Sequence, residues 1–131
     1  MNVEAILGLK GRDVLTVSPN ASILDAPNIL SEKKIGALAV SNDGETALGI
    51  ISERDIVNAV GASGASALGE TVDGLMTRNL RTCALGNTMH EVLSVMTERR
   101  FRHLPVIEDG KLCGIISIGD VVKTRLDEIT R

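Results

Sequence analysis

The chain has 131 residues, with 14 Lys and Arg against 17 Asp and Glu, a formal net charge of −3 and one aromatic residue, Phe101. Bases of single-stranded nucleic acid stack on aromatic side chains and phosphates attract basic surfaces, so this composition argues against nucleic acid as a partner. The same composition excludes an aromatic cage for quaternary ammonium groups. Since 44% of the residues are hydrophobic, we expect an aliphatic core in one compact domain or two small halves.

Two cysteines, Cys83 and Cys113, lie in apolar segments, without a CxxC spacing and without a histidine at metal-ligand spacing. We therefore expect both thiols to be reduced in a cytoplasmic protein that binds no metal. The N-terminus does not combine a basic segment with a following apolar run, so no signal peptide is expected. No apolar run reaches the length of about 18 residues that a membrane span needs.

The sequence contains an internal repeat, which decides the expected architecture. Residues 16–40 match residues 82–106 at an offset of 66 positions, and the offset falls to 65 after the turn that follows. The identical pairs are Thr16/Thr82, Glu32/Glu98, Leu38/Leu104, Val40/Val106, Asp43/Asp109, Gly44/Gly110, Asp55/Asp120 and Val57/Val122. Because one copy is too small to bury a sheet of its own, we expect the two copies to share a core around a pseudo-twofold axis.

Residues 1–13 are expected to be a lead-in with one helical turn at 3–7, ahead of a first repeat at 14–60. This repeat predicts a strand at 14–17, a helix capped by Ser22, strands at 38–40 and 48–51, and a helix at 53–60. Pro27 lies inside the helix that Ser22 would cap, which predicts a kink or a later start. The stretch 61–72, rich in Gly, Ala and Ser, is expected to be a flexible linker.

The second repeat, at 73–131, has the same order of strand, helix, strand, turn, strand and helix. Thr88 and Glu91 have the spacing of a capping box at the start of its first helix. Strands are expected at 104–107 and 112–116 around a turn at 108–110, followed by a helix at 118–129. The sequence therefore predicts an α+β fold made of two β-α-β-β-α repeats.

The most specific motif is Gly-Ile-Ile-Ser-x-x-Asp, which occurs at 49–55 and again at 114–120. A buried strand ends here and a helix begins, so free N–H groups of the helix point outward, where they favour an anion. The Ser hydroxyl can donate to a phosphate or ribose oxygen, and the Asp carboxylate can accept from ribose hydroxyls. Ser-x-x-Asp is also a capping box, and the sequence leaves both interpretations open.

In these motifs and their order, the chain resembles a CBS domain pair, a family named after cystathionine β-synthase and also called a Bateman module. The resemblance rests on residues 35–40 and 49–55 in the first copy, 100–107 and 114–120 in the second, and 75–77 between them. It implies a regulatory sensor that binds adenosine-containing ligands in clefts between the repeats and signals to an unidentified partner. AMP is the leading ligand, with ADP, ATP, NAD and S-adenosylmethionine as further candidates, which suits energy sensing.

The resemblance also implies roles for individual residues. The candidates are Asp55 and Asp120 for the ribose, Ser52, Ser117, Arg54, Arg102 and His103 for the phosphate side, and Thr16 and Thr82 for the adenine neighbourhood. For Thr16, Thr82 and Arg102, strand packing or solvation is the structural alternative. Since Gly36-Ala37 stands where the second copy has Arg102-His103, we expect two clefts that are not equivalent.

No P-loop, HExxH or nucleophile elbow occurs in the sequence. We therefore expect a stand-alone regulatory module with no catalytic activity and no catalytic cofactor. The resemblance further implies a homodimer that pairs through its helices. Two alternatives stay open, namely a dimerisation scaffold with degenerate sites and a small enzyme that uses His103 and Asp120.

Overall fold

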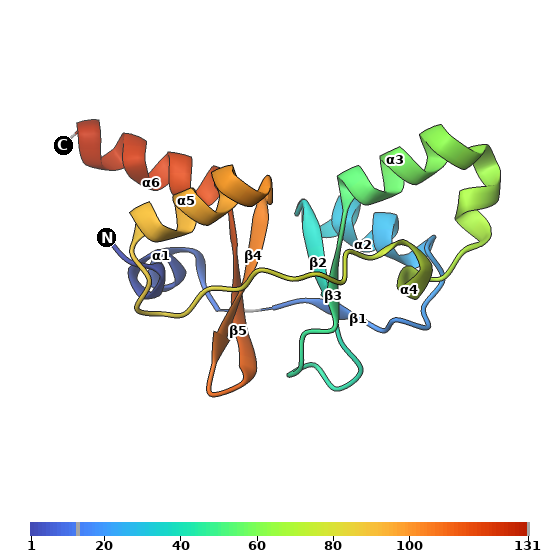
Figure 1. Ribbon diagram of the computed structural model, residues 1–131, viewed down its shortest axis with the longest axis horizontal. Helices are drawn as coiled ribbons and strands as arrows, with labels where there is room; N and C mark the ends of the chain where they lie inside the picture. The colour runs from blue at the N-terminus through green and yellow to red at the C-terminus, as the bar shows by residue number, and fades with distance from the viewer. Residues whose placement is uncertain (13, 131) are drawn as a thin grey trace. The chain divides into compact units, whose positions relative to one another are not determined.

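A computed structural model describes residues 1–12 and 14–130 of the chain (Figure 1). Its buried apolar residues form two hydrophobic cores, one in each half, so the expectation of one core shared by the two copies is wrong. The first half comprises Leu15–Leu80, and the second half combines Met1–Val14 with Arg81–Arg131. Asp13 and Arg131, which end two of the predicted ranges, lie outside the described residues.

The first half contains a three-stranded sheet in the order β1 (Thr16–Val17), β2 (Ala37–Val40) and β3 (Gly49–Ser52). β1 is parallel to β2, and β2 is antiparallel to β3 with Leu38 opposite Ile51. All four residues of β2 are buried, in agreement with the apolar run that predicted this strand. β1 is shorter than the strand predicted at 14–17, because its pairing with β2 begins at Thr16.

Three α-helices complete the first half, namely α2 (Asp25–Lys33), α3 (Glu53–Ser63) and α4 (Val72–Leu75). The prediction that Ser22 caps α2 is wrong, because Ser22 Oγ accepts from the Leu24 N–H (3.2 Å) in a turn and the helix begins at Asp25. Pro27 consequently falls in the first turn, where a missing N–H removes no intrahelical bond. The predicted later start of this helix is confirmed.

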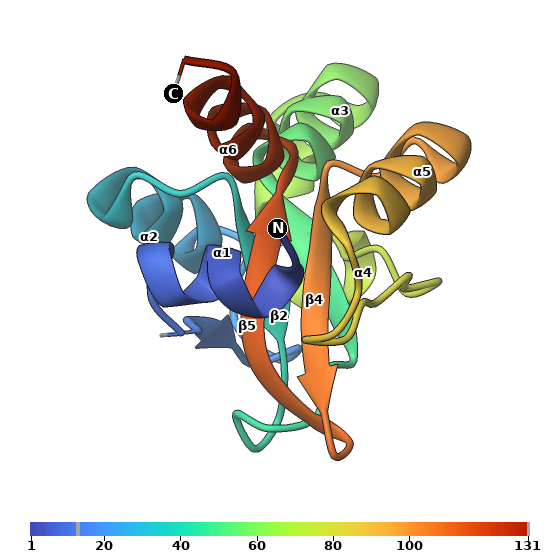
Figure 2. The same cartoon turned by 90° about the vertical axis from the view of Figure 1, so that its left-hand side faces the viewer.

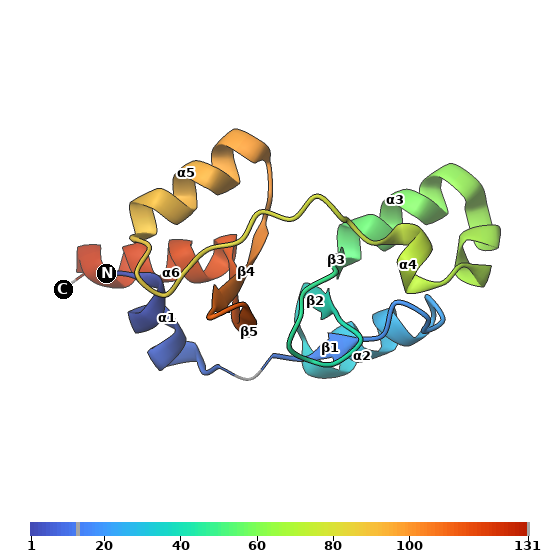
Figure 3. The same cartoon turned by 60° about the horizontal axis from the view of Figure 1, so that its bottom comes forward.

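Most of the segment 61–72, which was expected to be a flexible linker, is helical. α3 continues to Ser63, a 3₁₀ helix follows at Gly64–Gly69, and α4 begins at Val72 (Figure 3). Ala67 and Val72 are buried. Apolar contacts therefore order a segment whose composition alone favours flexibility.

The second half contains the antiparallel hairpin of β4 (His103–Glu108) and β5 (Lys111–Ser117). Both turn residues, Asp109 and Gly110, have positive φ angles of 52° and 78°, as a type I′ turn requires. Cys83 forms a parallel bridge with Val106, at the place where the first half has β1. The hairpin agrees with the predicted strands, whereas the predicted first strand of this repeat is reduced to a bridge.

The helices of the second half are α1 (Val3–Lys10), α5 (Met89–Arg99) and α6 (Ile118–Thr130). Thr88 and Glu91 form the predicted capping box at the start of α5. α1 exceeds the single turn that was predicted, and it packs against β5 with Leu7 in the core (Figure 2). Within the described residues, no helix combines the length and the apolar character needed to cross a membrane.

Each half incorporates the helix that precedes the other repeat in the sequence, α1 in the second half and α4 in the first. The backbone contacts correspond, since the Val3 N–H donates to the Asn87 carbonyl (2.9 Å) and the Val72 N–H donates to the Ala21 carbonyl (3.0 Å). The α+β architecture of two β-α-β-β-α repeats is confirmed.

The two cysteines are free thiols in the second half. Burial, with a smaller contribution from nearby Cys113, raises the pKa of Cys83 to about 12. Burial also raises the pKa of Cys113. Both thiols are therefore protonated at neutral pH and poor nucleophiles.

Candidate functional site

The first corner, formed by Ser52 and Asp55, joins the end of β3 to the start of α3. The Asp55 N–H donates to Ser52 Oγ (3.2 Å) and the Ser52 N–H donates to Asp55 Oδ2 (2.9 Å), which makes a capping box. The Ser52 hydroxyl also donates to Oδ2 (3.0 Å). The other carboxylate oxygen, Oδ1, accepts a longer bond of 3.3 Å from the Thr77 hydroxyl.

The second corner, formed by Ser117 and Asp120, joins β5 to α6. The Asp120 N–H donates to Ser117 Oγ (3.1 Å), and the Ser117 N–H donates to Asp120 Oδ2 (2.8 Å). Here Lys10, the last residue of α1, donates from Nζ to the same Oδ2 (2.6 Å) and to the Ile115 carbonyl (2.9 Å). Among the described residues, none donates a hydrogen bond to Asp120 Oδ1.

Each motif opens with a glycine because another element packs directly on the strand at that point. A Cβ at Gly49 would lie 2.7 Å from Met76 Sδ and 2.8 Å from the Thr77 carbonyl oxygen. A Cβ at Gly114 would lie 2.7 Å from Leu7 Cδ2. The glycines therefore allow the close approach that brings the residues of α1 and the segment after α4 to the two carboxylates.

Most first-turn amides of the two corner helices are already bonded within the protein. The Glu53 N–H donates to the Gly36 carbonyl (3.0 Å), and the Ile118 N–H donates to the Arg102 carbonyl (2.8 Å). The first-turn amides outside these bonds and the capping boxes are those of Arg54 and Gly119. The anion site expected from free amides is thus reduced to one amide in each corner.

The capping bond uses one oxygen of each carboxylate, and the other oxygen has a different environment. In both corners the capping bond goes to Oδ2. Oδ1 of Asp55 accepts from one neutral hydroxyl, whereas no described residue donates to Oδ1 of Asp120. The two interpretations of Ser-x-x-Asp are therefore compatible, because a carboxylate has about four acceptor positions.

Asp120 is ionised at neutral pH. Burial alone would raise the pKa of its carboxyl, but the hydrogen bonds from the Lys10 ammonium and the Ser117 N–H outweigh burial and hold the pKa below its ordinary value. The side chain of Asp120 is 23% exposed and that of Lys10 is 38% exposed. The second corner is thus a partly accessible ion pair.

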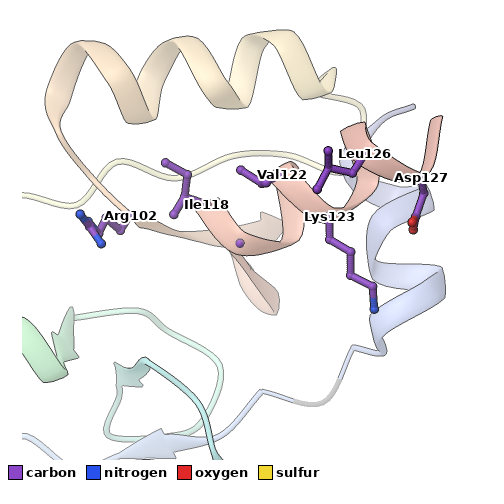
Figure 4. Close-up of a pocket in the computed structure, with 7 residues that line it drawn as sticks. Arg102, Ile118, Val122, Lys123, Leu126 and Asp127 are labelled. Atoms are coloured by element: carbon purple, nitrogen blue, oxygen red, sulfur yellow. The ribbon is translucent and has the colours of Figure 1, made fainter. Parts of the chain in front are cut away.

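His103 and Arg102, two candidates for the phosphate side, lie differently with respect to the second corner. His103 is half-buried at the start of β4, and its backbone is the register partner of Ser117. Arg102 is exposed and lines a shallow groove of about 500 Å³ along α6, together with Ile118 and Val122 (Figure 4). No bond joins Arg102 to Asp120 among the described residues.

Figure 4 shows Ile118, Val122 and Leu126 in a row along α6, with Lys123 pointing away from them. In the first half, the remaining basic candidate is Arg54, which is exposed in the first turn of α3. The structure therefore places the Ser and Asp candidates together in each half and leaves Arg54 and Arg102 at the surface.

Among the described residues, no hydrogen bond joins Thr16 or Thr82, the candidates for the adenine neighbourhood, to the corner of its own half. Thr16 is half-buried in β1, which is separated from β3 by β2. Thr82 is exposed and precedes the bridge that Cys83 makes to Val106.

Lys10 and Thr77 contact the two carboxylates, although neither was a candidate in the sequence. The repeat alignment does not relate them, because both lie before the aligned stretches, which begin at residues 16 and 82. The available signal was weak, namely a basic residue before Gly11 at the end of a short helix and a hydroxyl after Met76. Among the described residues, no cluster of three or more His, Cys, Asp or Glu side chains could hold a metal ion.

Comparison with known proteins agrees with this geometry. The CBS domain family model matches residues 8–62 and 72–127. A CBS-domain-containing protein from Agrobacterium tumefaciens is 47% identical, with a TM-score of 0.91 over 95% of this chain and 99% of that one. The CBS domain pair of protein MJ0100, solved in complex with 5′-methylthioadenosine and S-adenosyl-L-methionine, is 25% identical, with a TM-score of 0.85 over 95% of this chain and 99% of that one.

The chain belongs to the CBS domain family and carries two tandem CBS domains. A mitochondrial CBS-domain protein of Arabidopsis thaliana, CBSX3, is 34% identical over 96% of this chain. The chain spans 65% of the length of that relative. The fold and repeat pattern expected from the sequence are confirmed, and the class is that of regulatory ligand-binding modules.

Proposed function

We propose that the protein is a regulatory sensor that binds an adenosine-containing ligand at the two Ser-Asp corners and passes its occupancy to a partner protein. The observation that supports the proposal is that Oδ2 of each carboxylate caps the helix, while Oδ1 accepts one long bond from the Thr77 hydroxyl in Asp55 and none from a described residue in Asp120. Each Oδ1 can therefore accept a hydrogen bond from a ligand. A ribose offers two neighbouring hydroxyls, which are suitable donors to such an oxygen. The related MJ0100 pair binds adenosyl compounds, which supports this ligand class.

Within this proposal, Asp55 and Asp120 accept from ribose hydroxyls. Ser52, Ser117, Arg54, Arg102 and His103 face the phosphate side, and Thr16 and Thr82 stand near the adenine. With one aromatic residue in the chain, the adenine contacts are aliphatic side chains and backbone amides. AMP is the leading ligand, followed by ADP, ATP, NAD and S-adenosylmethionine.

The proposed role is regulation, with the ligand leaving unchanged. Incubation of the protein with AMP, ATP and NAD, followed by chromatography, should return each compound intact. Turnover of any of them would favour the alternative of a small enzyme at His103 and Asp120.

The proposed oligomer is a homodimer that pairs through α6. The exposed fractions of Ile118, Val122 and Ile129 are 37%, 50% and 70%, and these side chains extend along the helix. Light scattering after size exclusion should give twice the mass of the chain, and Val122→Glu should reduce that mass. A monomeric wild-type protein would exclude the pairing.

The first experiment is identification by mass spectrometry of small molecules that copurify with the protein, followed by thermal unfolding with each candidate nucleotide. A ligand at about 100 times its Kd should stabilise the fold by about 2.7 kcal/mol. If AMP, ADP, ATP, NAD and S-adenosylmethionine all leave the unfolding temperature unchanged, the sensing function is wrong and the scaffold alternative is favoured.

A further inference from the structure

The two corners are tied to neighbouring segments by different chemistry. In the first half, Ile50 and Thr77 exchange two backbone hydrogen bonds of 3.0 Å and 2.8 Å. In the second half, the carbonyl of Ile115, the counterpart of Ile50, accepts from the Lys10 ammonium (2.9 Å). A neutral partner is thus sufficient to cover this strand edge, and the positive charge of Lys10 exceeds what the fold requires.

The same ammonium lies directly on the candidate ribose residue, 2.6 Å from Asp120 Oδ2. An ammonium has three N–H donors, and two are engaged, one by the carboxylate and one by the Ile115 carbonyl. Among the described residues, the third donor and Asp120 Oδ1 have no further partner, and both side chains are partly exposed. A donor with a positive charge and an acceptor therefore stand side by side.

The motif of the second corner has no basic residue of its own between Ser117 and Asp120. The first corner carries Arg54 at the place where the second has Gly119. Asp55 in turn forms no ion pair with any described residue. The second corner thus obtains its cation from α1.

We propose that Lys10 is a ligand-binding residue that makes the second corner selective for adenosine ligands carrying an anionic group, such as AMP over adenosine. The inference rests on the proposed function above. Lys10 offsets the charge of Asp120, which would otherwise repel a phosphate, and its third N–H donates to that phosphate. Asp120 Oδ1 accepts from the ribose in the same complex.

The structural alternative is that Lys10 only holds α1 on β5. In that case its removal would weaken the second half without distinguishing a charged ligand from a neutral one. The test therefore compares two ligands that differ in the phosphate alone. Isothermal titration calorimetry with AMP and with adenosine, in the Asp55→Asn background, reports on the second corner.

In this background, Lys10→Met should lower the affinity for AMP about ten- to a hundred-fold and the affinity for adenosine by less than about three-fold. The loss for AMP is that expected for a charge-assisted hydrogen bond. Lys33→Met is the matched control, because Lys33 is the basic residue in the last turn of α2. This control should change neither affinity. Lys10→Arg should keep most of the preference for AMP, and added salt should reduce that preference in the parent protein.

An equal loss for AMP and adenosine in Lys10→Met, or tighter AMP binding, would overturn the role of Lys10 and leave the proposed function standing. Thermal unfolding of each variant shows whether a loss reflects unfolding, and Lys10→Arg repeats the comparison if Lys10→Met does not fold. If the unmodified protein binds neither AMP nor adenosine, the proposed function itself is wrong, and this inference is wrong with it.

Discussion

The first and second corners have the same strand-to-helix order and the same Ser-Asp capping box, but different partners on the carboxylate. Asp55 contacts the neutral hydroxyl of Thr77 at 3.3 Å, whereas Asp120 contacts the ammonium of Lys10 at 2.6 Å. The repeat preserved the scaffold, since caps and glycine contacts recur in both halves. The charge of the residue that faces the carboxylate differs between the halves, because this residue lies in a segment outside the aligned motifs.

Two corners with the same Ser-x-x-Asp motif can therefore differ in the charge that faces the carboxylate. A residue that precedes the repeat in sequence, such as Lys10, reaches the corner because α1 packs in the second half. The two sites are therefore expected to differ in their preference for ligand charge. Variants that change one corner and spare the other test this comparison.

The largest expected effect concerns the glycines of the two motifs. Gly49→Ala should lower the free energy of unfolding by about 3 kcal/mol, and Gly114→Ala by about 1–2 kcal/mol. The first places a Cβ against the backbone oxygen of Thr77, whereas the second meets the flexible end of Leu7. Denaturation in urea measures both. Gly61→Ala is the control, because a Cβ at Gly61 in α3 would meet open space, and it should leave the free energy of unfolding unchanged or raise it. An equal loss of stability in Gly49→Ala and Gly114→Ala would contradict the predicted difference between backbone and side-chain contacts.

The next effect concerns the caps. Ser52→Ala and Ser117→Ala should each destabilise the protein by about 1 kcal/mol, because each removes the acceptor of a helix N–H. The change at Ser52 should cost slightly more, since its hydroxyl also donates to Asp55 (3.0 Å). Thermal unfolding provides the measurement, with Ser94→Ala on the exposed face of α5 as control. A larger loss at Ser117 than at Ser52 would contradict a stabilising role for the additional bond of the Ser52 hydroxyl.

A smaller effect is the coupling within the second corner. A double-mutant cycle of Lys10→Met and Asp120→Asn should give a coupling free energy of about 0.5–1 kcal/mol between the two side chains at neutral pH. The pKa of Asp120 is lowered in the folded state. The stabilisation by the Lys10–Asp120 ion pair is therefore fully present above the pKa that Asp120 has in the unfolded chain, and it is lost as the pH falls through the lower pKa of the folded state. The loss should therefore occur below the ordinary value of 3.8. Coupling that persists unchanged under more acidic conditions would contradict the ion pair.

The smallest effect lies in the turns. Backbone N–H groups of Thr46 and Glu45, together with the Ser41 hydroxyl, lower the pKa of Asp43 to about 2. A positive φ occurs at Gly44 and at its counterpart Gly110, but of the two aspartates only Asp109, in the turn of the second half, has a positive φ. NMR titration should place the pKa of Asp43 near 2, and Ser41→Ala should raise it. An ordinary carboxyl pKa at Asp43 would mean that the first turn is not held by this side chain.

The sequence predicted the fold because a repeat carries information on both of its copies. The strands at 38–40 and 104–107 and the Thr88 cap could be read from local patterns. The prediction for Ser22 was wrong because its hydroxyl accepts from the Leu24 N–H in a turn, and the helix starts three residues after Ser22, at Asp25. The segment 61–72 was predicted to be a flexible linker because its composition is typical of linkers, but burial of Ala67 orders it.

The Ser and Asp residues of the corners could be predicted because their capping geometry depends on residues three positions apart. Lys10 could not, because its contact with Asp120 joins residues 110 positions apart. No local pattern encodes the packing of α1 on β5. A residue that contacts a carboxylate only through tertiary packing therefore cannot be predicted from a sequence motif.

The measurement that tests the central claim most directly is calorimetric titration of AMP into the protein and into Asp55→Asn and Asp120→Asn. We predict two unequal classes of site in the parent, or one site, with each variant losing the class that belongs to its own corner. Two identical, independent sites would contradict the inequality of the corners. Unchanged binding in both variants would contradict the assignment of ribose recognition to Asp55 and Asp120.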